Sequence, residues 1–252
     1  MDLKSKMKQT ISRNPRIILD NEEAEVIIET RHLFREFQTG DTTVHALQDV
    51  NLKVYTQDFI VIFGPSGCGK STLLNLILGI DEPTKGEVLI NGLNIFKLEE
   101  DNRANFRSRK IGMIYQMPYW VKSLNILENV ALPLIAEGIK TDHALQRAKE
   151  ILEGLNLYKF ALQPPNQLSG GEQQKMELAR SLVTDPWIIM ADEPTGNLDS
   201  TSGKEIIDLL HSMNEKQGKT IILVTHNEEY WSSGNRRIEM KDGQIIKDTN
   251  HG

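Results

Sequence analysis

Three short apolar runs stand out along the chain, at residues 59–63, 187–191 and 220–225. Apolar runs of this length, bounded by polar segments, are typical of strands that are buried on both faces of a parallel sheet. Each run leads directly into glycine-rich or polar sequence. Because ligands bind beyond the carboxyl ends of the strands in an open parallel sheet, this pattern predicts an α/β core with a binding site at that edge.

Helical patterns follow two of these runs. Residues 73–78, which come after the glycine-rich segment 64–72, are predicted to form one helix, and apolar residues at helical spacing in 206–213 predict a second helix that ends near Gly218. Residues 144–155 show the same spacing behind a possible cap at Thr141 or Asp142. We expect residues 100–165 to form a helical subdomain inserted into the α/β core.

Shorter β-rich segments flank this core. Residues 50–55 alternate apolar and polar side chains, as a half-exposed antiparallel strand does. Residues 26–30 and 87–92 are further strand candidates, and the latter ends in an Asn-Gly turn pair. The predicted fold class is therefore α/β, with a mostly parallel core sheet, a small antiparallel β subdomain and an inserted helical subdomain, all within residues 26–252.

Residues 1–25 are predicted to form an N-terminal extension, because they begin with a cluster of basic residues and end with acidic ones. A solvated tail is one interpretation, and contact with anionic lipid or with a partner protein is the other.

Composition narrows the range of functions. The chain has 252 residues, a formal net charge of −6 and an isoelectric point near 5.6, so nucleic acid is not expected as its main partner. Its single cysteine excludes an internal disulfide and fits a reducing compartment. The sequence shows neither a secretory signal nor an apolar stretch of about 18 residues that could span a bilayer. We expect a cytosolic chain whose contact with a membrane is indirect.

The segment after the first apolar run fits G-x-x-x-x-G-K-[ST], the pattern of a phosphate-binding loop. Glycines let successive backbone N–H groups point at phosphate oxygens, and the start of the next helix adds its dipole. Lys70 supplies charge for the β- and γ-phosphates, and the Ser71 hydroxyl can ligate Mg²⁺. The alternative is a glycine turn that precedes a helix start. The candidate nucleotide-binding residues are Gly64, Pro65, Ser66, Gly67, Cys68, Gly69, Lys70, Ser71 and Thr72.

An acidic pair ends the second apolar run. The Asp192 carboxylate can hold Mg²⁺, directly or through water. Glu193 points the other way along an extended strand and can accept a proton from an attacking water. An acidic pair at a strand end can also be a plain loop feature, so its proximity to the phosphate-binding loop decides the interpretation.

Two further side chains follow predicted strands. His226 comes directly after the third apolar run and could contact a γ-phosphate or hold the attacking water in line, although a lone histidine is more often structural. Gln116 follows the short run 111–114, and its amide oxygen could reach Mg²⁺ or the water.

A second anion-binding helix start is predicted at Ser169, Gly170 and Gly171. One nucleotide does not need two such loops from one chain. The economical explanation is that this loop binds the γ-phosphate of a nucleotide held by a second copy of the chain. In isolation, the same three residues would indicate only the start of a helix.

Taken in order, these segments resemble the motifs of the nucleotide-binding subunit of ABC transporters over about residues 26–248. The resemblance implies a P-loop NTPase core that binds ATP and Mg²⁺ and works as a dimer. It identifies Walker A at 64–72, the Q-loop at Gln116, the signature at 168–173, Walker B ending at Asp192, the catalytic Glu193, the D-loop at 197–199 and the switch histidine His226.

Roles follow from this resemblance residue by residue. It implies that Glu193, His226 and Gln116 are catalytic, and that Ser71, Gln116 and Asp192 hold the metal. It further implies that Asp199 joins the signature residues at the nucleotide. The adenine-stacking aromatic of the family is matched best by Phe37, which could instead be a plain core residue.

The resemblance also implies the biological setting. Two copies would close head to tail on ATP and move an integral membrane permease, with the chain peripheral at the cytoplasmic face of the inner membrane. Segments 126–133 and 165–171 resemble the lipoprotein-release and macrolide-export branch, to which the cell-division ABC ATPase is a close relative. Residues 117–121 depart from the leucine-rich stretch usual there, and Tyr119 and Trp120 either contact the membrane subunit or pack internally.

Two alternative classes stay open on the sequence alone. A soluble ABC ATPase acting on DNA or ribosomes typically carries a long coiled coil or two cassettes in one chain, and neither is visible here. A module that switches a partner by ATP occupancy without hydrolysis would not need Glu193 and His226, both of which are present.

Overall fold

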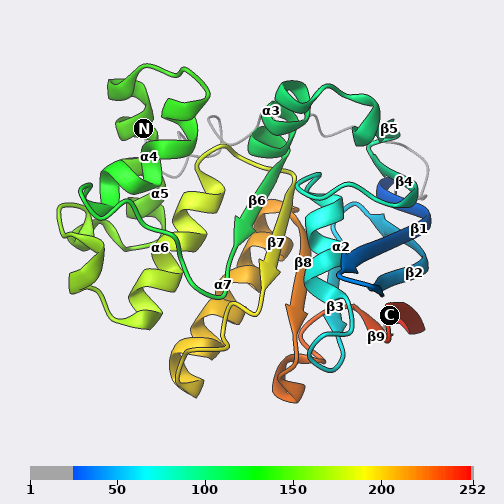
Figure 1. Cartoon of the computed structure of the whole chain (residues 1–252). Helices are drawn as coiled ribbons and strands as arrows, with labels where there is room; N and C mark the ends of the chain where they lie inside the picture. The colour runs from blue at the N-terminus through cyan, green and yellow to red at the C-terminus, as the bar shows by residue number, and fades with distance from the viewer. Residues whose placement is uncertain (1–24, 251–252) are drawn as a thin grey trace.

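The computed structural model describes residues 25–250 and arranges them as two sheets with flanking helices (Figure 1). Within these residues, six strands form the larger sheet in the order β10-β9-β3-β8-β7-β6. The strands pair in parallel except for β10, which is antiparallel to β9. Their bounds are β3 (Phe59–Phe63), β6 (Ile111–Ile114), β7 (Ile188–Asp192), β8 (Thr220–Thr225), β9 (Arg236–Lys241) and β10 (Gln244–Asn250).

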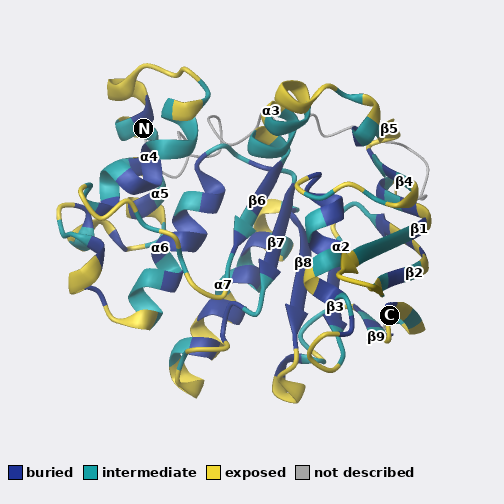
Figure 2. Ribbon diagram, viewed as in Figure 1, coloured by how far each residue is buried: buried dark blue, intermediate teal, exposed yellow. Residues whose placement is uncertain are grey.

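The three apolar runs fall on β3, β8 and β7, which lie side by side in the middle of this sheet. Alternate side chains of β3 enter two different hydrophobic clusters, with Ile60 and Ile62 on one face and Phe59 and Val61 on the other. Figure 2 shows these central strands as buried. The prediction of a parallel core sheet that is covered on both faces is therefore confirmed.

The smaller sheet is antiparallel, as predicted, but the two strands of its first hairpin are much longer than the sequence indicated. It has the order β2-β1-β4-β5 within the described residues, with bounds β1 (Val26–Thr39), β2 (Thr42–Tyr55), β4 (Lys85–Ile90) and β5 (Leu93–Asn94). Register shifts interrupt the alternation of β1, and both strands are largely exposed toward the tip of their hairpin. Because of these two features, the alternation of apolar and polar residues did not predict strands at residues 31–49. The predicted Asn-Gly turn is present, with φ of 49° at Asn91 and 73° at Gly92 between β4 and β5.

Helices connect and cover the sheets. The α-helices are α2 (Lys70–Ile77), α3 (Glu100–Lys110), α4 (Ile126–Ala136), α5 (Thr141–Gly154), α6 (Gly170–Leu182) and α7 (Ser200–Gln217), and the short 3₁₀ helices are η1 (Ile95–Lys97), η2 (Tyr158–Phe160), η3 (Pro165–Gln167) and η4 (Glu228–Tyr230). The predicted stop of α7 is correct, because Gly218 adopts a left-handed conformation at its C-cap. The predicted cap of α5 is wrong: Thr141 and Asp142 lie in its first turn, and the cap position is Lys140, whose side chain makes no capping bond.

The region predicted as helical, residues 100–165, contains more than helices. Its strand β6 pairs in parallel with β7 at the edge of the six-stranded sheet. Helices α4 and α5 pack instead with α6, around a separate cluster that includes Val130, Ala148, Leu152 and Met176. The α4–α6 unit therefore extends past residue 165. The predicted N-terminal extension, up to residue 24, lies outside the described residues.

Among the helices of residues 25–250, none combines the length and the apolar character that crossing a bilayer would require.

A buried arginine joins the two sheets. Arg236 on β9 donates to the carbonyl of Lys53 on β2 over 2.6 Å and makes two bonds of 2.6 and 2.8 Å to the Asp248 carboxylate on β10. We expect Arg236→Met to lower the free energy of unfolding by about 2 kcal/mol, because it breaks the bond to β2 and leaves the partly buried Asp58 carboxylate, 3.5 Å from Arg236 Nη1, without its counter-charge.

Urea denaturation measures this change. The matched control is Arg31→Met, which removes a pair of 2.7 Å to Glu29 on the exposed surface of β1 and should leave the midpoint nearly unchanged. Equal midpoint shifts in the two variants would contradict a joining role for Arg236.

Candidate functional site

The loop between β3 and α2 packs so closely on its neighbours that it requires glycine at two positions. A Cβ on Gly64 would lie 2.1 Å from the carbonyl oxygen of Met240, and one on Gly69 would lie 2.4 Å from that of Ala46. The φ angles are 155° at Gly64 and 103° at Gly69, conformations that L-residues with side chains rarely adopt. The sequence thus folds residues 64–69 into a tight curl against β2 and β9.

This curl surrounds the start of α2. Gly69 is the N-cap and supplies no side-chain cap, so the first backbone N–H groups of the helix face the loop. Lys70 is buried, and its Nζ donates to the carbonyl oxygens of Gly64 at 2.7 Å and Pro65 at 3.0 Å. Positive charge and unpaired N–H groups are the features that bind phosphate. Cys68 fills the space beneath the loop, buried and 3.8 Å from Lys70 Nζ.

Asp192, the last residue of β7, lies against the start of α2. The side chain of Ser71 lies beside its carboxylate, and Asp192 Oδ1 is buried without a hydrogen-bond partner among the described residues. Burial raises the pKa of Asp192, and the neighbouring Glu193 adds to that, while Ser71 and Lys70 oppose it. One buried carboxylate oxygen beside a serine hydroxyl is a donor set that fits Mg²⁺, which proteins often bind with few side chains and the phosphates of a nucleotide.

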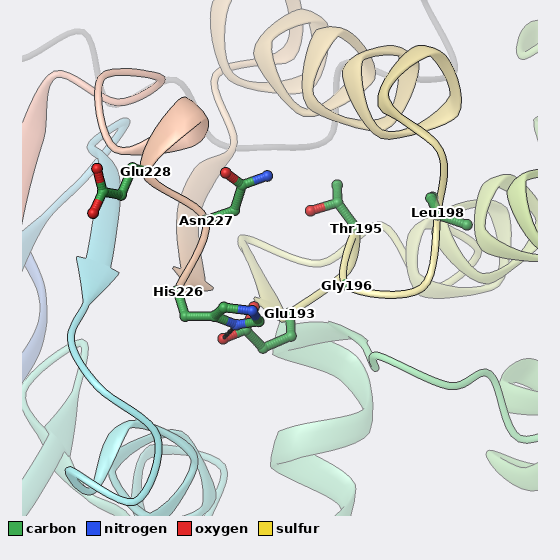
Figure 3. A pocket seen from close by; sticks show the side chains of 7 residues that line it. All are labelled: Glu193, Thr195, Gly196, Leu198, His226, Asn227 and Glu228. Carbon is green, nitrogen blue, oxygen red and sulfur yellow. Dashed lines mark ion pairs between the residues drawn. The ribbon is translucent and has the colours of Figure 1, made fainter.

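Glu193 and His226 meet at the carboxyl ends of β7 and β8. The Glu193 backbone N–H bonds the carbonyl of Val224 over 2.9 Å, and the chain then turns sharply, with φ of 48° at Glu193. Its Oε1 lies 2.8 Å from His226 Nδ1, as the dashed line in Figure 3 marks. Glu193 Oε2 is buried and has no hydrogen-bond partner in residues 25–250. The carboxylate therefore keeps one acceptor oxygen available to a water.

An open cavity of about 450 Å³ lies beside this pair (Figure 3). Besides Glu193 and His226, its lining includes Leu198 of the predicted D-loop and four residues that were not predicted to have a role in the site. The turn after Glu193 contributes Thr195, Gly196 and Leu198, and the segment after His226 contributes Asn227 and Glu228. Their nearness in sequence to the two predicted residues was the only available signal.

The loop after β6 carries Gln116 to the same place. A Cβ on Gly196 would lie 2.9 Å from Gln116 Nε2, so the glutamine amide rests directly on the turn that follows Glu193. Asn197 Nδ2 also approaches the Gln116 carbonyl oxygen, at 3.5 Å. The structure thus brings Gln116, Asp192, Glu193 and His226 to one edge of the sheet.

Ser169, Gly170 and Gly171 form the start of α6. Ser169 is the N-cap in a capping box: its Oγ accepts the Glu172 N–H at 3.4 Å, and Glu172 Oε2 accepts the Ser169 N–H at 2.8 Å. Gly170 and Ser169 are exposed. Figure 1 shows strands β6, β7 and β8 between α6 and α2. This helix start and the curl at residues 64–69 therefore lie apart from each other in the folded subunit.

Asp199 lies beside the start of α6. It caps α7, and its carboxylate accepts the backbone N–H of Ser202 at 3.0 Å and its hydroxyl at 2.7 Å. These bonds hold the pKa of Asp199 below its ordinary value. A Cβ on Gly171 would lie 2.8 Å from Ser202 Oγ, so the two helix starts touch and form one exposed surface.

Phe37 is half-buried on β1, and the Arg35 guanidinium lies over its ring at 4.4 Å. Arg35 pairs in register with Leu47, whose side chain contacts the position of Gly69. The hairpin therefore carries Phe37 to the side of the β3–α2 loop. This placement is compatible with a stacking platform and leaves little support for a plain core residue.

Trp120 packs internally, whereas Tyr119 does not. Trp120 Nε1 donates to Gln173 Oε1 at 3.1 Å, while the Tyr119 side chain is exposed together with Met117 and Val121. The unusual segment 117–121 thus splits into one inward-facing ring and an exposed apolar group.

Known proteins match the chain along most of its length. A profile described as ABC transporter matches residues 47–196. The chain is 46% identical over 223 residues to the macrolide export ATP-binding/permease protein MacB of Aggregatibacter actinomycetemcomitans, covering 88% of this chain and 34% of that protein. It is 38% identical to the lipoprotein-releasing system ATP-binding protein LolD of Syntrophus aciditrophicus, over 87% of this chain and 99% of that one. The chain therefore spans about a third of MacB and nearly all of LolD.

A solved structure also matches the fold of the chain. The ATP-binding cassette MJ0796 of Methanocaldococcus jannaschii, described as a dimer in a post-hydrolysis state bound to ADP and Pi, superposes with a TM-score of 0.83 at 39% identity. The match covers 90% of this chain and 99% of that one.

The raised pKa of Asp192 leads to a stability prediction. The folded chain holds the Asp192 proton more tightly than the unfolded chain, so ionisation of this carboxyl destabilises the fold above the raised pKa. We expect Asp192→Asn to raise the melting temperature at pH 7 in EDTA. The gain should shrink as the pH falls toward about 4, the ordinary pKa of an unfolded Asp.

Thermal melts at several pH values measure this effect. Asp208→Asn, an exposed change on α7, is the control and should leave the melting temperature unchanged throughout. A lower melting temperature for Asp192→Asn than for the wild type at pH 7 would show that the carboxylate contributes more through its bonds than it costs by burial.

Proposed function

The chain belongs to the ABC transporter family of ATPases, and on that premise we propose that it is the ATP-hydrolysing motor subunit of a transporter. Two copies close head to tail on two molecules of ATP with Mg²⁺, and the closure moves an integral membrane permease. Hydrolysis then reopens the pair.

One observation carries this proposal. The chain has a glycine-rich curl at residues 64–69, before the start of α2, and a second exposed helix start at Ser169, and strands β6, β7 and β8 separate them. A nucleotide held by Lys70 cannot use both within one subunit. A second copy placed head to tail offers its own Ser169–Gly171 segment to the γ-phosphate, and the dimeric form of the relative MJ0796 supports such an arrangement.

The chemistry at each nucleotide divides among the residues already placed. Lys70 and the backbone N–H groups of the loop bind the β- and γ-phosphates. Ser71, Asp192 and Gln116 would hold Mg²⁺, which would neutralise charge on the transferred phosphoryl group. Glu193 accepts the proton of the attacking water through its free oxygen, and His226 fixes the carboxylate through the other.

The remaining contacts recognise the base and close the partner's site. Phe37, backed by Arg35, stacks on adenine from the β1–β2 hairpin. Gly170, Gly171 and Asp199 lie on the joint surface of α6 and α7 and face the nucleotide of the second copy.

The names of the relatives support a place in the macrolide-export and lipoprotein-release branch. In that setting the chain is peripheral at the cytoplasmic face of the inner membrane. We assign the permease contact to the exposed apolar side chains of Met117, Tyr119 and Val121, which follow Gln116 directly. Binding at this surface would link the permease to the nucleotide site.

Mixing two inactive variants tests the composite site. Lys70→Ala removes the phosphate charge, and Gly170→Asp adds repulsion at the helix start offered to the partner. In mixed dimers one site combines both defects and the other has neither. Because about half of randomly formed dimers are mixed, and each has one intact site, we expect roughly a quarter of wild-type activity from an equimolar mixture, measured by phosphate release.

Each variant alone, at the same total concentration, is the control and should retain less than about one per cent of wild-type activity. A mixture no more active than the two variants measured separately would contradict a site that is shared between copies.

Replacing the proposed base tests its role separately. We expect Glu193→Gln to lower kcat by about 10²–10⁴-fold and to trap an ATP-bound dimer in gel filtration, because ATP still binds but the water is not deprotonated. The control Glu229→Gln, exposed on η4, should elute and hydrolyse as the wild type does. Turnover by Glu193→Gln within about tenfold of the wild type would exclude Glu193 as the base.

A further inference from the structure

Helix α6 carries a buried ion pair that the proposed chemistry does not use. Glu177 is 1% exposed, and its carboxylate accepts a short bond from the Arg180 guanidinium, one turn further along the helix. Its second oxygen, Oε1, has no hydrogen-bond partner within residues 25–250. A buried carboxylate of this kind is costly to fold, and an apolar side chain would fill the position more cheaply. The pair therefore calls for an explanation other than stability.

The other contacts of Arg180 are with the loop that carries Gln116. Its Nη1 donates to the carbonyl oxygen of Tyr119 at 2.6 Å, and its guanidinium lies over the Trp120 ring at 4.6 Å. Glu177 fixes the guanidinium in the one orientation that permits both contacts. Lysine could not replace it, because only the planar fork of arginine can stack on a ring and bond two acceptors at once.

Other residues of α6 fasten the same loop at its two ends. The buried Gln174 donates to the carbonyl oxygen of Tyr115 at 2.7 Å, directly before Gln116. At the other end, Gln173 Oε1 accepts the Trp120 indole N–H at 3.1 Å. Strand β6 also approaches the helix backbone, since a Cβ on Gly112 would lie 2.5 Å from the Ser181 carbonyl oxygen. The segment 115–120 is thus held to α6 at both of its ends.

We propose that Glu177 and Arg180 are positioning residues, which hold the Gln116 loop on α6 so that Gln116 and the Ser169–Gly171 segment move as one body. This inference rests on the proposed function, because only then does Gln116 serve the subunit's own nucleotide while the start of the same helix serves its partner's. The ion pair ties the two half-sites together. A subunit in which Gln116 is positioned for its own nucleotide therefore also positions its Ser169–Gly171 segment for the nucleotide of the partner.

A double-mutant cycle tests whether Arg180 acts through Gln116. Phosphate release is measured on the full chain, at concentrations where activity per molecule has reached its plateau, for the wild type, Gln116→Ala, Arg180→Lys and the double variant. We expect Arg180→Lys to lower kcat about tenfold and to leave KM for ATP within about twofold. In the Gln116→Ala background the same change should cost less than about twofold, because the side chain it positions is already absent.

The matched control is Arg147→Lys, since Arg147 pairs with Glu150 at the same spacing on the neighbouring α5 and does not touch the loop. Its kcat should equal that of the wild type. Arg180→Lys keeps the charge opposite Glu177, so it is expected to fold, and thermal melts verify this. Should it unfold, Glu177→Gln replaces it in the cycle and should show the same loss and the same dependence on Gln116.

Three results would overturn the inference while leaving the proposed function intact. These are an unchanged kcat in Arg180→Lys, an equal loss in both backgrounds, and a wild-type rate in Gln116→Ala. Failure of the proposed function looks different: the wild-type chain would not hydrolyse ATP, or the mixture of Lys70→Ala and Gly170→Asp would gain no activity. Either of those outcomes would remove the basis of this inference as well.

Discussion

The parallel pairing of β3, β8 and β7 is the constraint on which the site depends. Phe63 pairs with Thr225 and Asp192 with Val224, so the three strands end at nearly the same level. One more ladder bond, from the Glu193 N–H to Val224, extends this alignment past the end of β7. The phosphate loop, the acidic pair and His226 therefore meet because the strands are in register. A shift of one residue in the register of β7 would turn the side chains of Asp192 and Glu193 to the opposite faces of the sheet.

The site is also where the fold gives up stability. Asp192 and Glu193 are adjacent carboxylates, each with a buried oxygen that no residue between 25 and 250 satisfies. Elsewhere, buried polar groups such as Asn129 and Lys219 are bonded several times. Two unsatisfied acceptors on adjacent residues at one edge of the sheet are typical of positions that bind something external. Here the natural complement is a cation with its phosphates and a water.

Sequence reasoning succeeded where the signal was local and failed where it depended on distant partners. The buried strands, the Gly218 stop and the Asn91 turn are set by residues within a few positions of one another, and all were predictable. The length of the β1–β2 hairpin was not, because bulges break its alternation and its tip is exposed on both faces. The four-residue strand β6 was recognised as a strand, but only its pairing with β7 shows that it belongs to the sheet rather than to the helical unit. The contacts of Trp120 and Arg180 join segments some 60 residues apart and carried no sequence signal.

The arrangement of helix starts sets how the two half-sites can communicate. In the proposed dimer the start of α2 faces the subunit's own nucleotide, whereas the starts of α6 and α7, which touch at Gly171 and Ser202, face that of the second copy. Gln116 lies between these two groups, resting on Gly196 on one side and joined to α6 through its loop on the other. Any displacement of the Glu193–Gly196 turn is therefore passed to Gln116 by direct contact, and from there to the surface offered to the second copy. Because packed interfaces of this kind shift between discrete arrangements rather than deform gradually, we expect occupancy of one site in the proposed dimer to bias the geometry of the other.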